Sequence, residues 1–175
     1  RAFEKARIAD PEAVLFLNEY NQESVPAKGA QFLKLVERLL KAGCPLQGVG
    51  LQSHLWIDIP EGVIAAYMRE ISQFGLPIHV SELDCTLRTE NRLDLRSQAD
   101  RIAAQEARVT ELASAFATLP KAQQFAFTVW GLRDTDSWYR QGDKDDGRDK
   151  PLPFDSFGRP NPMAAAIAAG FKTPA

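Results

Sequence analysis

The protein has 175 residues, of which 45% are hydrophobic and 25% are charged, and its formal net charge is −2. These values are typical of a soluble globular protein, and the length is sufficient for one domain with a sizeable core, so we treat residues 1–175 as one unit. The weak net charge does not indicate nucleic acid or an anionic membrane as a partner. No apolar run approaches the roughly 20 residues of a membrane span.

Segments with helical periodicity alternate along the chain with short apolar runs. Residues 1–9 look like a helix interior with no start signal before it, so we expect the first residue to be a cut within a longer sequence. Residues 13–17 form a continuous apolar run that fits a strand buried on both faces, as in parallel sheets. The predicted strands are 13–17, 48–54, 76–84 and 125–130, and the predicted helices are 1–9, 29–42, 60–74, 97–119 and 163–170.

This alternation predicts an α/β fold with parallel strands joined by right-handed helical crossovers. A group of polar residues follows each strand. In barrels of parallel strands the carboxyl ends meet on one face, which carries the active site, so the four groups predict a single site. The groups are Asn18, Glu19, Tyr20 and Asn21; Gln52 and His54; Glu82 and Asp84; and Trp130 and Asp134.

The third predicted strand ends in two carboxylates. In the segment PIHVSELDC (77–85), Glu82 and Asp84 are two residues apart and therefore on the same side of an extended chain. For this segment alone, a strand end whose acids cap the next loop is the simpler interpretation. The coincidence of four polar groups at four strand ends favours a catalytic function for Glu82 instead.

The sequence indicates no metal and no cofactor. Cys44 and Cys85 are expected to be free thiols, because two cysteines do not make a disulfide framework. No CxxC or HxxxH spacing is available for zinc. The charged segment 143–150 lacks the spacing and the distal Glu of a calcium loop, and we expect it to be a solvated excursion.

Four segments in this order resemble the strand ends of one enzyme family. LFLNEYN, GVGLQSHL, PIHVSELD and FTVWGLRDTDSW are similar to the fifth to eighth strands of family 10 glycoside hydrolases, and PLPFDSFGRPNPM is similar to the last loop of that family. The resemblance covers essentially the whole chain. It implies four parallel β-strands alternating with helices, as the C-terminal half of a (β/α)8 TIM barrel, and the activity of a retaining endo-1,4-β-xylanase.

The resemblance also implies roles for individual residues. Glu82 matches the nucleophile, His54 matches the histidine that hydrogen-bonds the nucleophile, and Asp84 matches the third acid of that network. A retaining glycosidase needs an ionised carboxylate to attack the anomeric carbon, and an imidazole donor favours that charged form. The implied substrate-binding residues are Gln52 in the pocket of the reacting sugar, Trp130 and Trp138 around the −1 subsite, and Tyr20 and Asn21 on the leaving-group side. Taken singly, His54 would be interpreted as a satisfied core histidine and the two tryptophans as core packing, but their arrangement with Glu82 favours the functional roles.

A retaining mechanism also needs a second carboxyl group as acid/base. In the family this group ends the fourth strand, so we expect it to precede Arg1 and to be absent from this chain. Glu19 follows an Asn at a strand end and imitates that motif, but it lies only two strands before the strand of Glu82, whereas the acid/base lies three strands before it. Glu23 lies beyond the strand end and is a weaker candidate.

The leading hypothesis is therefore a half-barrel that hydrolyses internal β-1,4-xylosidic bonds when an N-terminal half completes it. That half could be a separate chain or a further segment of the same protein. The expected substrate is xylan or a xylo-oligosaccharide, which implies secretion or a periplasmic location. The alternatives are a non-catalytic half-barrel that binds xylan or self-associates, and an enzyme that prefers β-1,4-glucan.

Overall fold

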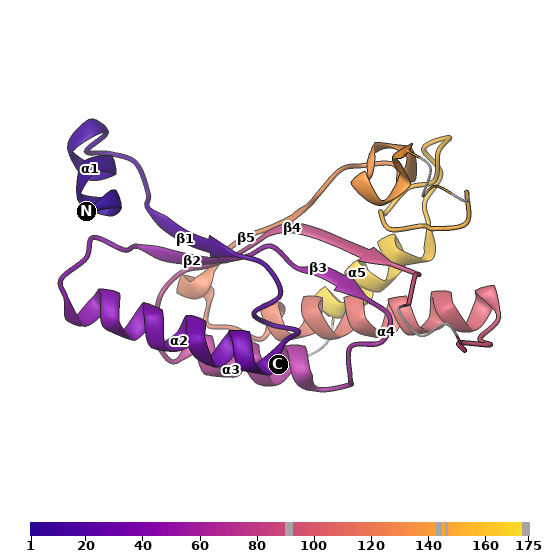
Figure 1. Cartoon of the computed structure of the whole chain (residues 1–175), viewed down its shortest axis with the longest axis horizontal. Coiled ribbons are helices and arrows are strands. Elements are labelled where there is room, and N and C mark those ends of the chain that lie inside the picture. Colours follow the sequence, from indigo (N-terminus) through magenta and orange to yellow (C-terminus); the bar gives the residue numbers. More distant parts are fainter. Residues whose placement is uncertain (90–92, 143–144, 146, 173–175) are drawn as a thin grey trace.

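The computed structural model describes residues 1–89, 93–142, 145 and 147–172, so part of the predicted solvated excursion 143–150 lies outside the described residues. Helices and strands alternate along the chain, which confirms the predicted α/β class (Figure 1). The helices are α1 (Ala2–Ala9), α2 (Pro26–Lys41), α3 (Val63–Ser72), α4 (Gln98–Ala117) and α5 (Pro162–Lys172). The strands are β1 (Phe16–Glu19), β2 (Gly48–Leu51), β3 (His54–Trp56), β4 (Ile78–Thr86) and β5 (Gln124–Val129).

All the strand pairs are parallel. The sheet runs in the order β1, β2, β4, β5, and β3 continues beside the far end of β4 after a short break from β2. Each connection between neighbouring strands of this order contains a helix, as parallel pairing requires. Among the described strands, β1 pairs only with β2 and β5 pairs only with β4, so each has an edge without a strand partner.

The first strand begins later than predicted, at Phe16 rather than at residue 13. The backbone before Phe16 is held by side chains: Arg7 donates to the carbonyl of Ala13, and Gln47 accepts from the amide of Leu15. The prediction that this strand is buried on both faces is also wrong. β1 lies at the edge of the sheet, and Asn18 is exposed.

The second predicted strand is divided into β2 and β3. The break falls at Gln52 and Ser53, and Ser53 has φ of +60°. Positive φ is uncommon for a residue other than glycine and interrupts the extended chain. Ser53 is fully buried, so the packing around it holds this conformation. The division turns the chain so that His54 can pair with Asp84 on β4.

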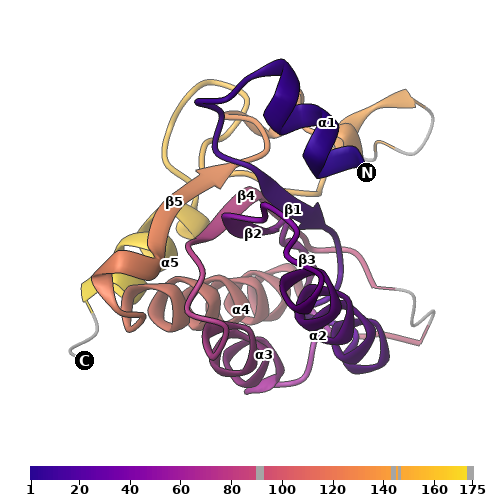
Figure 2. The same cartoon turned by 90° about the vertical axis from the view of Figure 1, so that its left-hand side faces the viewer.

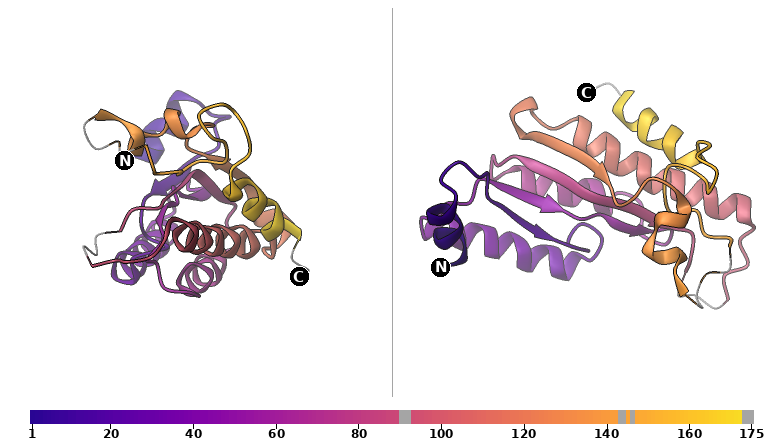
Figure 3. Two further views of the ribbon diagram at one scale, coloured as in Figure 1. Left: turned by 90° about the vertical axis from the view of Figure 1, so that its right-hand side faces the viewer. Right: turned by 90° about the horizontal axis from the view of Figure 1, so that it is seen from above.

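One face of the sheet is covered by α2, α3 and α4 (Figure 2), and α5 lies alongside α4 (Figure 3). Burial of apolar side chains between this face and the helices is the main source of stability. The strand side of this core contains Val49, Leu51, Ile78, Val80 and Leu83, and the helix side contains Phe32, Val36, Ile64, Met68, Ile71, Val109 and Leu112. Cys85 is buried here as a free thiol, and Cys44 is a half-buried free thiol.

The opposite face of the sheet, called the open face below, is not covered by these helices (Figure 2). Phe16, His79 and Phe125 contact one another there, with ring centroids 4.6 to 6.2 Å apart. Phe125 keeps 52% of its surface exposed. Within the described part of the chain, no helix has the length and apolar character needed to span a membrane.

Candidate active site

The carboxyl end of β4 contains one more residue than either neighbouring strand at the same level. Between the pairs Leu51–Val80 and His54–Asp84, β4 advances four residues while the chain beside it advances three. Towards β5, β4 advances three residues from Val80 to Leu83 while β5 advances two. One extra residue in a paired strand is a β-bulge, which redirects the side chains that follow it. Ser81 and Glu82 lie in this bulge.

The bulge changes which side chains of β4 face the core. Before it, even-numbered residues pack against the helices, and His79 and Ser81 contact groups on the open face. After it, odd-numbered residues pack against the helices, and Glu82 and Asp84 contact His54 instead. The fully buried core residues on the two sides of the change are Ile78 and Val80, then Leu83 and Cys85.

Glu82, His54 and Asp84, predicted as one network, lie together in the structure. His54 Nδ1 is 2.9 Å from Asp84 Oδ1, and His54 Nε2 is 3.4 Å from Glu82 Oε2. The other oxygen of Asp84 accepts a hydrogen bond of 2.8 Å from the indole nitrogen of Trp138. The Asp84 side chain is fully buried, whereas 15% of the His54 side chain and 16% of the Glu82 side chain are exposed. Asp84 therefore supports His54, and Glu82 is the accessible carboxylate.

The charges of this network favour a proton on the His54–Asp84 pair. Burial lowers the pKa of His54, but the hydrogen bond and charge of Asp84, with a contribution from Glu82, outweigh burial and raise it above its usual value. Burial raises the pKa of Asp84, although the hydrogen bonds from His54 and Trp138 act to lower it. Both directions mean that the pair keeps its shared proton to a higher pH than a free imidazole would. A protonated His54 can donate from both nitrogens, to Asp84 and to Glu82.

Trp130 and Trp138 border this network. Their rings lie 6.3 and 5.7 Å from the His54 ring, edge to face, and about half of each side chain is exposed. Trp138 also packs on Tyr139, with ring centroids 4.2 Å apart. Aromatic faces of this kind stack against the apolar faces of pyranose rings. Trp130 and Trp138 were expected here; Tyr139 was not.

The remaining predicted binding residues lie at neighbouring strand ends. Gln52 is half-buried in the break between β2 and β3, and its backbone N–H donates to the backbone carbonyl of Glu19. Tyr20 is 52% exposed, and Lys28 Nζ lies 3.3 Å from the centre of its ring. Asn21 has φ of +60° and lines a cavity of about 480 Å³ with Trp56 and Tyr139.

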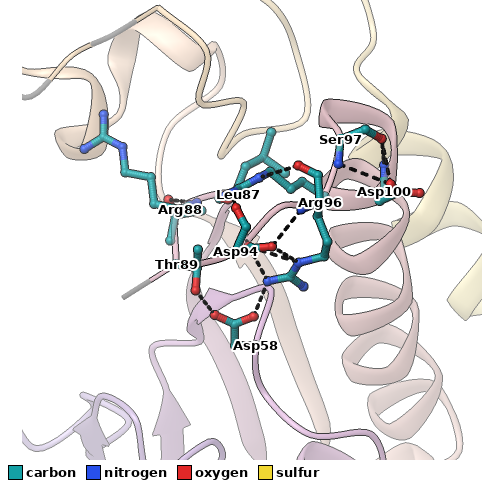
Figure 4. Close-up of polar contacts among 10 residues, drawn as sticks. Asp58, Leu87, Arg88, Thr89, Asp94, Arg96, Ser97 and Asp100 are labelled. Carbon is teal, nitrogen blue, oxygen red and sulfur yellow. Dashed lines mark hydrogen bonds and ion pairs between the residues drawn. The ribbon is translucent and has the colours of Figure 1, made fainter. Parts of the chain in front are cut away.

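An ion-pair network borders this cavity beyond β4 (Figure 4). Arg96 donates from Nε to Asp94 Oδ1 over 2.9 Å and also pairs with Asp58 in the loop after β3. The Arg96 hydrogen bonds hold the pKa of Asp94 at about 2. Ser97 and Asp100 form a capping box that begins α4. These contacts fix one rim of the cavity to both β3 and α4.

The two alternative acids lie in different surroundings. Glu19 follows Asn18 on a regular strand and therefore points to the opposite face, where it accepts from the Tyr20 amide and from Lys28 Nζ over 2.9 and 3.0 Å. These contacts lower the pKa of Glu19, whereas a general acid needs a raised one. Glu23 is 1% exposed, and burial raises its pKa. Neither side chain contacts Glu82 among the described hydrogen bonds and ion pairs.

Asn18 is a contact of Glu82 to which the sequence assigned no role. Its amide nitrogen donates to Glu82 Oε1 over 3.1 Å. Asn18 belongs to a predicted polar group, and strand alternation alone places it on the face opposite to Glu19. The sequence does not show that the Glu82 side chain lies on the same face of the sheet as Asn18.

Fold and site together define a class of protein: a partial parallel (β/α) barrel with a carboxylate, an imidazole and exposed tryptophans at its carboxyl edge. The sequence profile of glycosyl hydrolase family 10 matches residues 1–170. The chain belongs to this family.

Several characterised relatives are xylanases. The chain is 30% identical to endo-beta-1,4-xylanase Xyn10C of Cellvibrio japonicus over 96% of its own length and 30% of that protein. It is 31% identical to an endo-1,4-beta-xylanase of Geobacillus stearothermophilus, over 93% of its own length and 50% of that enzyme. The chain thus spans half or less of the length of these relatives.

Solved structures give the same result. A thermostable mutant of the Cellvibrio japonicus xylanase Xyn10A superposes with a TM-score of 0.84 at 32% identity, over 97% of this chain and 53% of that one. Xyn10C from the same organism, solved in complex with xylopentaose, superposes with a TM-score of 0.84 at 30% identity, over 99% of this chain and 37% of that one. The fold is therefore part of a family 10 (β/α)8 barrel, as predicted.

The protonation of His54 gives a prediction that needs no substrate. Replacing Asp84 by Asn removes the hydrogen-bonding anion that raises the pKa of His54, so that pKa should fall. The chain has two histidines, and NMR titration of their ring protons measures both. Asp136→Asn, which breaks an exposed pair with Arg133, is the matched control and should leave His54 unchanged. An unchanged His54 pKa in Asp84→Asn would contradict the assigned pairing.

The same pair should make stability depend on pH. A histidine whose folded-state pKa is raised stabilises the fold fully below its unfolded pKa of about 6.5, and this contribution is lost as the pH rises through the folded value. The raised pKa of Asp84 acts in the same direction, although its contribution starts to be lost at lower pH, above the unfolded Asp value of about 3.9. Thermal denaturation across this range should therefore show a loss of stability at higher pH that is smaller in Asp84→Asn than in the parent protein.

Proposed function

We propose that this chain supplies the nucleophile half of a retaining endo-1,4-β-xylanase, with Glu82 as the nucleophile. The observation that carries this proposal is the placement of Glu82: a partly exposed carboxylate at the carboxyl edge of the sheet, contacted by His54 and bordered by two exposed tryptophans. Family membership and the xylanase activity named for its relatives support the same substrate class.

In the proposed mechanism, one oxygen of Glu82 attacks the anomeric carbon of a xylosyl unit. The glycosidic bond breaks, and the remainder of the xylan leaves with the glycosidic oxygen. A covalent glycosyl–enzyme ester forms, and water then hydrolyses it with overall retention of configuration. His54 holds Glu82 in its ionised form and fixes its orientation, while Asp84 and Trp138 hold His54. Trp130 and Trp138 would wall the −1 subsite, with Gln52 in the pocket of the reacting sugar.

The leaving oxygen must receive a proton, and in a retaining enzyme a second carboxyl group about 5–5.5 Å from the nucleophile donates it. Asp84 is unsuited to this role, because His54 and Trp138 occupy its two oxygens and the side chain is fully buried. We propose that the acid/base lies outside residues 1–175, on an N-terminal half whose strands would pair with the free edges of β1 and β5. Tyr20 and Asn21 would lie on the leaving-group side.

The substrate is proposed to be xylan or a xylo-oligosaccharide. The complex of the relative Xyn10C with xylopentaose supports a site that accepts several linked xylose units. A polymeric substrate of this kind favours action outside the cytoplasm. The unpaired edges of β1 and β5 also support a second candidate function, in which two copies of this chain close each other's edges and bind xylan without hydrolysing it.

The first test compares the chain alone with the completed domain, meaning this chain joined to or mixed with the N-terminal half of a family 10 barrel. The completed domain should hydrolyse xylan, and Glu82→Gln should lower kcat/KM by on the order of 10⁴-fold or more, because the nucleophile is lost. Glu19→Gln, on the opposite face of β1, is the matched control and should retain activity.

The chain alone should show no xylan hydrolysis above background, because it lacks the acid/base. Hydrolysis by the chain alone that Glu82→Gln abolishes would contradict the placement of the acid/base outside the chain. Light scattering on the chain alone addresses the second candidate: a stable homodimer that binds xylan, with no activity on completion, would favour the non-catalytic function.

A second prediction concerns His54. His54→Ala should lower kcat/KM of the completed domain about 10- to 100-fold, the usual effect of losing one hydrogen bond to a charged group. The acidic limb of the pH–rate profile should also move to higher pH, because the ionised form of the nucleophile loses a donor. A profile with an unmoved acidic limb would indicate that His54 has only a structural role.

A further inference from the structure

Asn18 holds the second oxygen of Glu82. His54 lies 3.4 Å from Glu82 Oε2, and the Asn18 amide nitrogen donates to Oε1 over 3.1 Å, so each carboxylate oxygen has its own neighbour. The two neighbours come from different strands, β3 and β1. A carboxylate held at both oxygens has its plane fixed as well as its position, which matters for a group that must attack along one direction.

Ser81 contacts the carbonyl end of the Asn18 amide, while the Glu82 carboxylate, which can only accept, takes the NH₂ end. The Ser81 hydroxyl donates to Asn18 Oδ1 over 3.0 Å, so the carbonyl end of the amide is occupied, and the NH₂ end is directed at Glu82. An amide turned the other way would place its oxygen against the carboxylate and lose the hydrogen bond to Glu82. Ser81 and Glu82 are consecutive, and only the bulge in β4 allows both to reach Asn18.

Gly50 provides the space for this arrangement. A Cβ atom added at Gly50 would lie 2.3 Å from Asn18 Oδ1 and 2.8 Å from its amide carbon, closer than real Cβ contacts. The Asn18 side chain therefore lies directly over the Gly50 backbone, in the neighbouring strand. The backbone of the bulge is fixed separately, because the Thr128 hydroxyl on β5 donates to the Ser81 carbonyl over 2.6 Å.

We propose that Asn18 is a positioning residue for the nucleophile Glu82, contacted at its other end by Ser81 and accommodated by Gly50. This inference rests on the proposed function, since it assigns Glu82 the nucleophilic role. Once one oxygen of Glu82 has formed the ester, the other is a carbonyl oxygen, which can still accept from the Asn18 amide, so the same donor keeps the plane of the carboxyl group fixed during the attack. The titratable groups that face Glu82 are His54 from β3 and His79 from β4, and Asp84 lies behind His54, on its other ring nitrogen.

The first experiment uses the 175-residue chain and needs no catalysis. With ¹⁵N labelling, the side-chain amide signals of Asn18 should move with pH as Glu82 titrates. They should stop moving in Glu82→Gln and should change environment in Ser81→Ala. Asn161, whose side-chain amide donates to Asp134, is the internal control, and its own response to pH should be the same in the parent chain and in both variants. Asn18 signals that are independent of pH in the parent chain would overturn the proposal.

The second experiment uses kinetics of the completed domain on an aryl xylobioside. Asn18→Ala should lower kcat/KM about 10- to 100-fold and move the acidic limb to higher pH, because a hydrogen bond to the charged carboxylate is lost. Gly50→Ala should reproduce both effects by displacing Asn18, and Ser81→Ala should give a smaller loss with the same direction. Thermal denaturation of each variant separates these effects from unfolding.

The controls separate a failure of the positioning role of Asn18 from a failure of the proposed nucleophilic role of Glu82. Glu19→Gln alters the neighbouring residue of β1 without touching Asn18 and should match the parent in rate and pH profile. If Glu82→Gln is inactive while Asn18→Ala and Gly50→Ala keep the parent rate and acidic limb, the positioning role of Asn18 is wrong and the proposed function stands. If Glu82→Gln keeps the parent activity, the proposed function itself fails.

Discussion

The extra residue in β4 is the constraint on which the site depends. In a regular strand, side chains alternate between two faces, so Glu82 and Asp84 would follow Ile78 and Val80 into the apolar core against the helices. Two carboxylates there would carry a severe desolvation cost. The bulge reverses the alternation, so that the apolar residues Leu83 and Cys85 fill the core instead. One inserted residue thus reconciles a buried strand with an accessible acidic site.

The electrostatics of the site divide its two acids into different roles. Asp84 is fully buried and is held by His54 and Trp138, whereas Glu82 is partly exposed and is held by His54 and Asn18. Because the buried pair retains a proton, His54 presents a donor towards Glu82. The difference in burial, more than any difference in residue type, separates the accessible carboxylate of Glu82 from the buried carboxylate of Asp84.

Much of the fold could be predicted from the sequence because each unit carries a strong local signal. The apolar runs, the helical periodicity and Gly43 and Gly75 with positive φ after α2 and α3 mark the units. The grouping of polar residues at strand ends then follows from parallel topology. The start of β1 was wrong because Arg7 and Gln47 compete for its backbone, a contact between distant residues that no local pattern reveals.

The finer geometry of the site could not be predicted for a related reason. A bulge is defined by counting residues against neighbouring strands, so no property of residues 77–85 alone shows it. The contact between Asn18 and Glu82 depends on that count, on Ser81 and on the absence of a side chain at Gly50. These residues lie in three different strands. Residue types indicated the chemistry, and pairing between strands determined which side chains meet.

The most direct test of Glu82 as the nucleophile is covalent trapping in the completed domain. A 2-deoxy-2-fluoro-xylobioside with a dinitrophenolate leaving group needs little protonation to react and forms a slowly hydrolysed ester. Mass spectrometry of the digested protein should find the added sugar on the peptide that contains Glu82, with no label in Glu82→Gln. A label on another carboxylate, or an undiminished label in Glu82→Gln, would contradict this assignment.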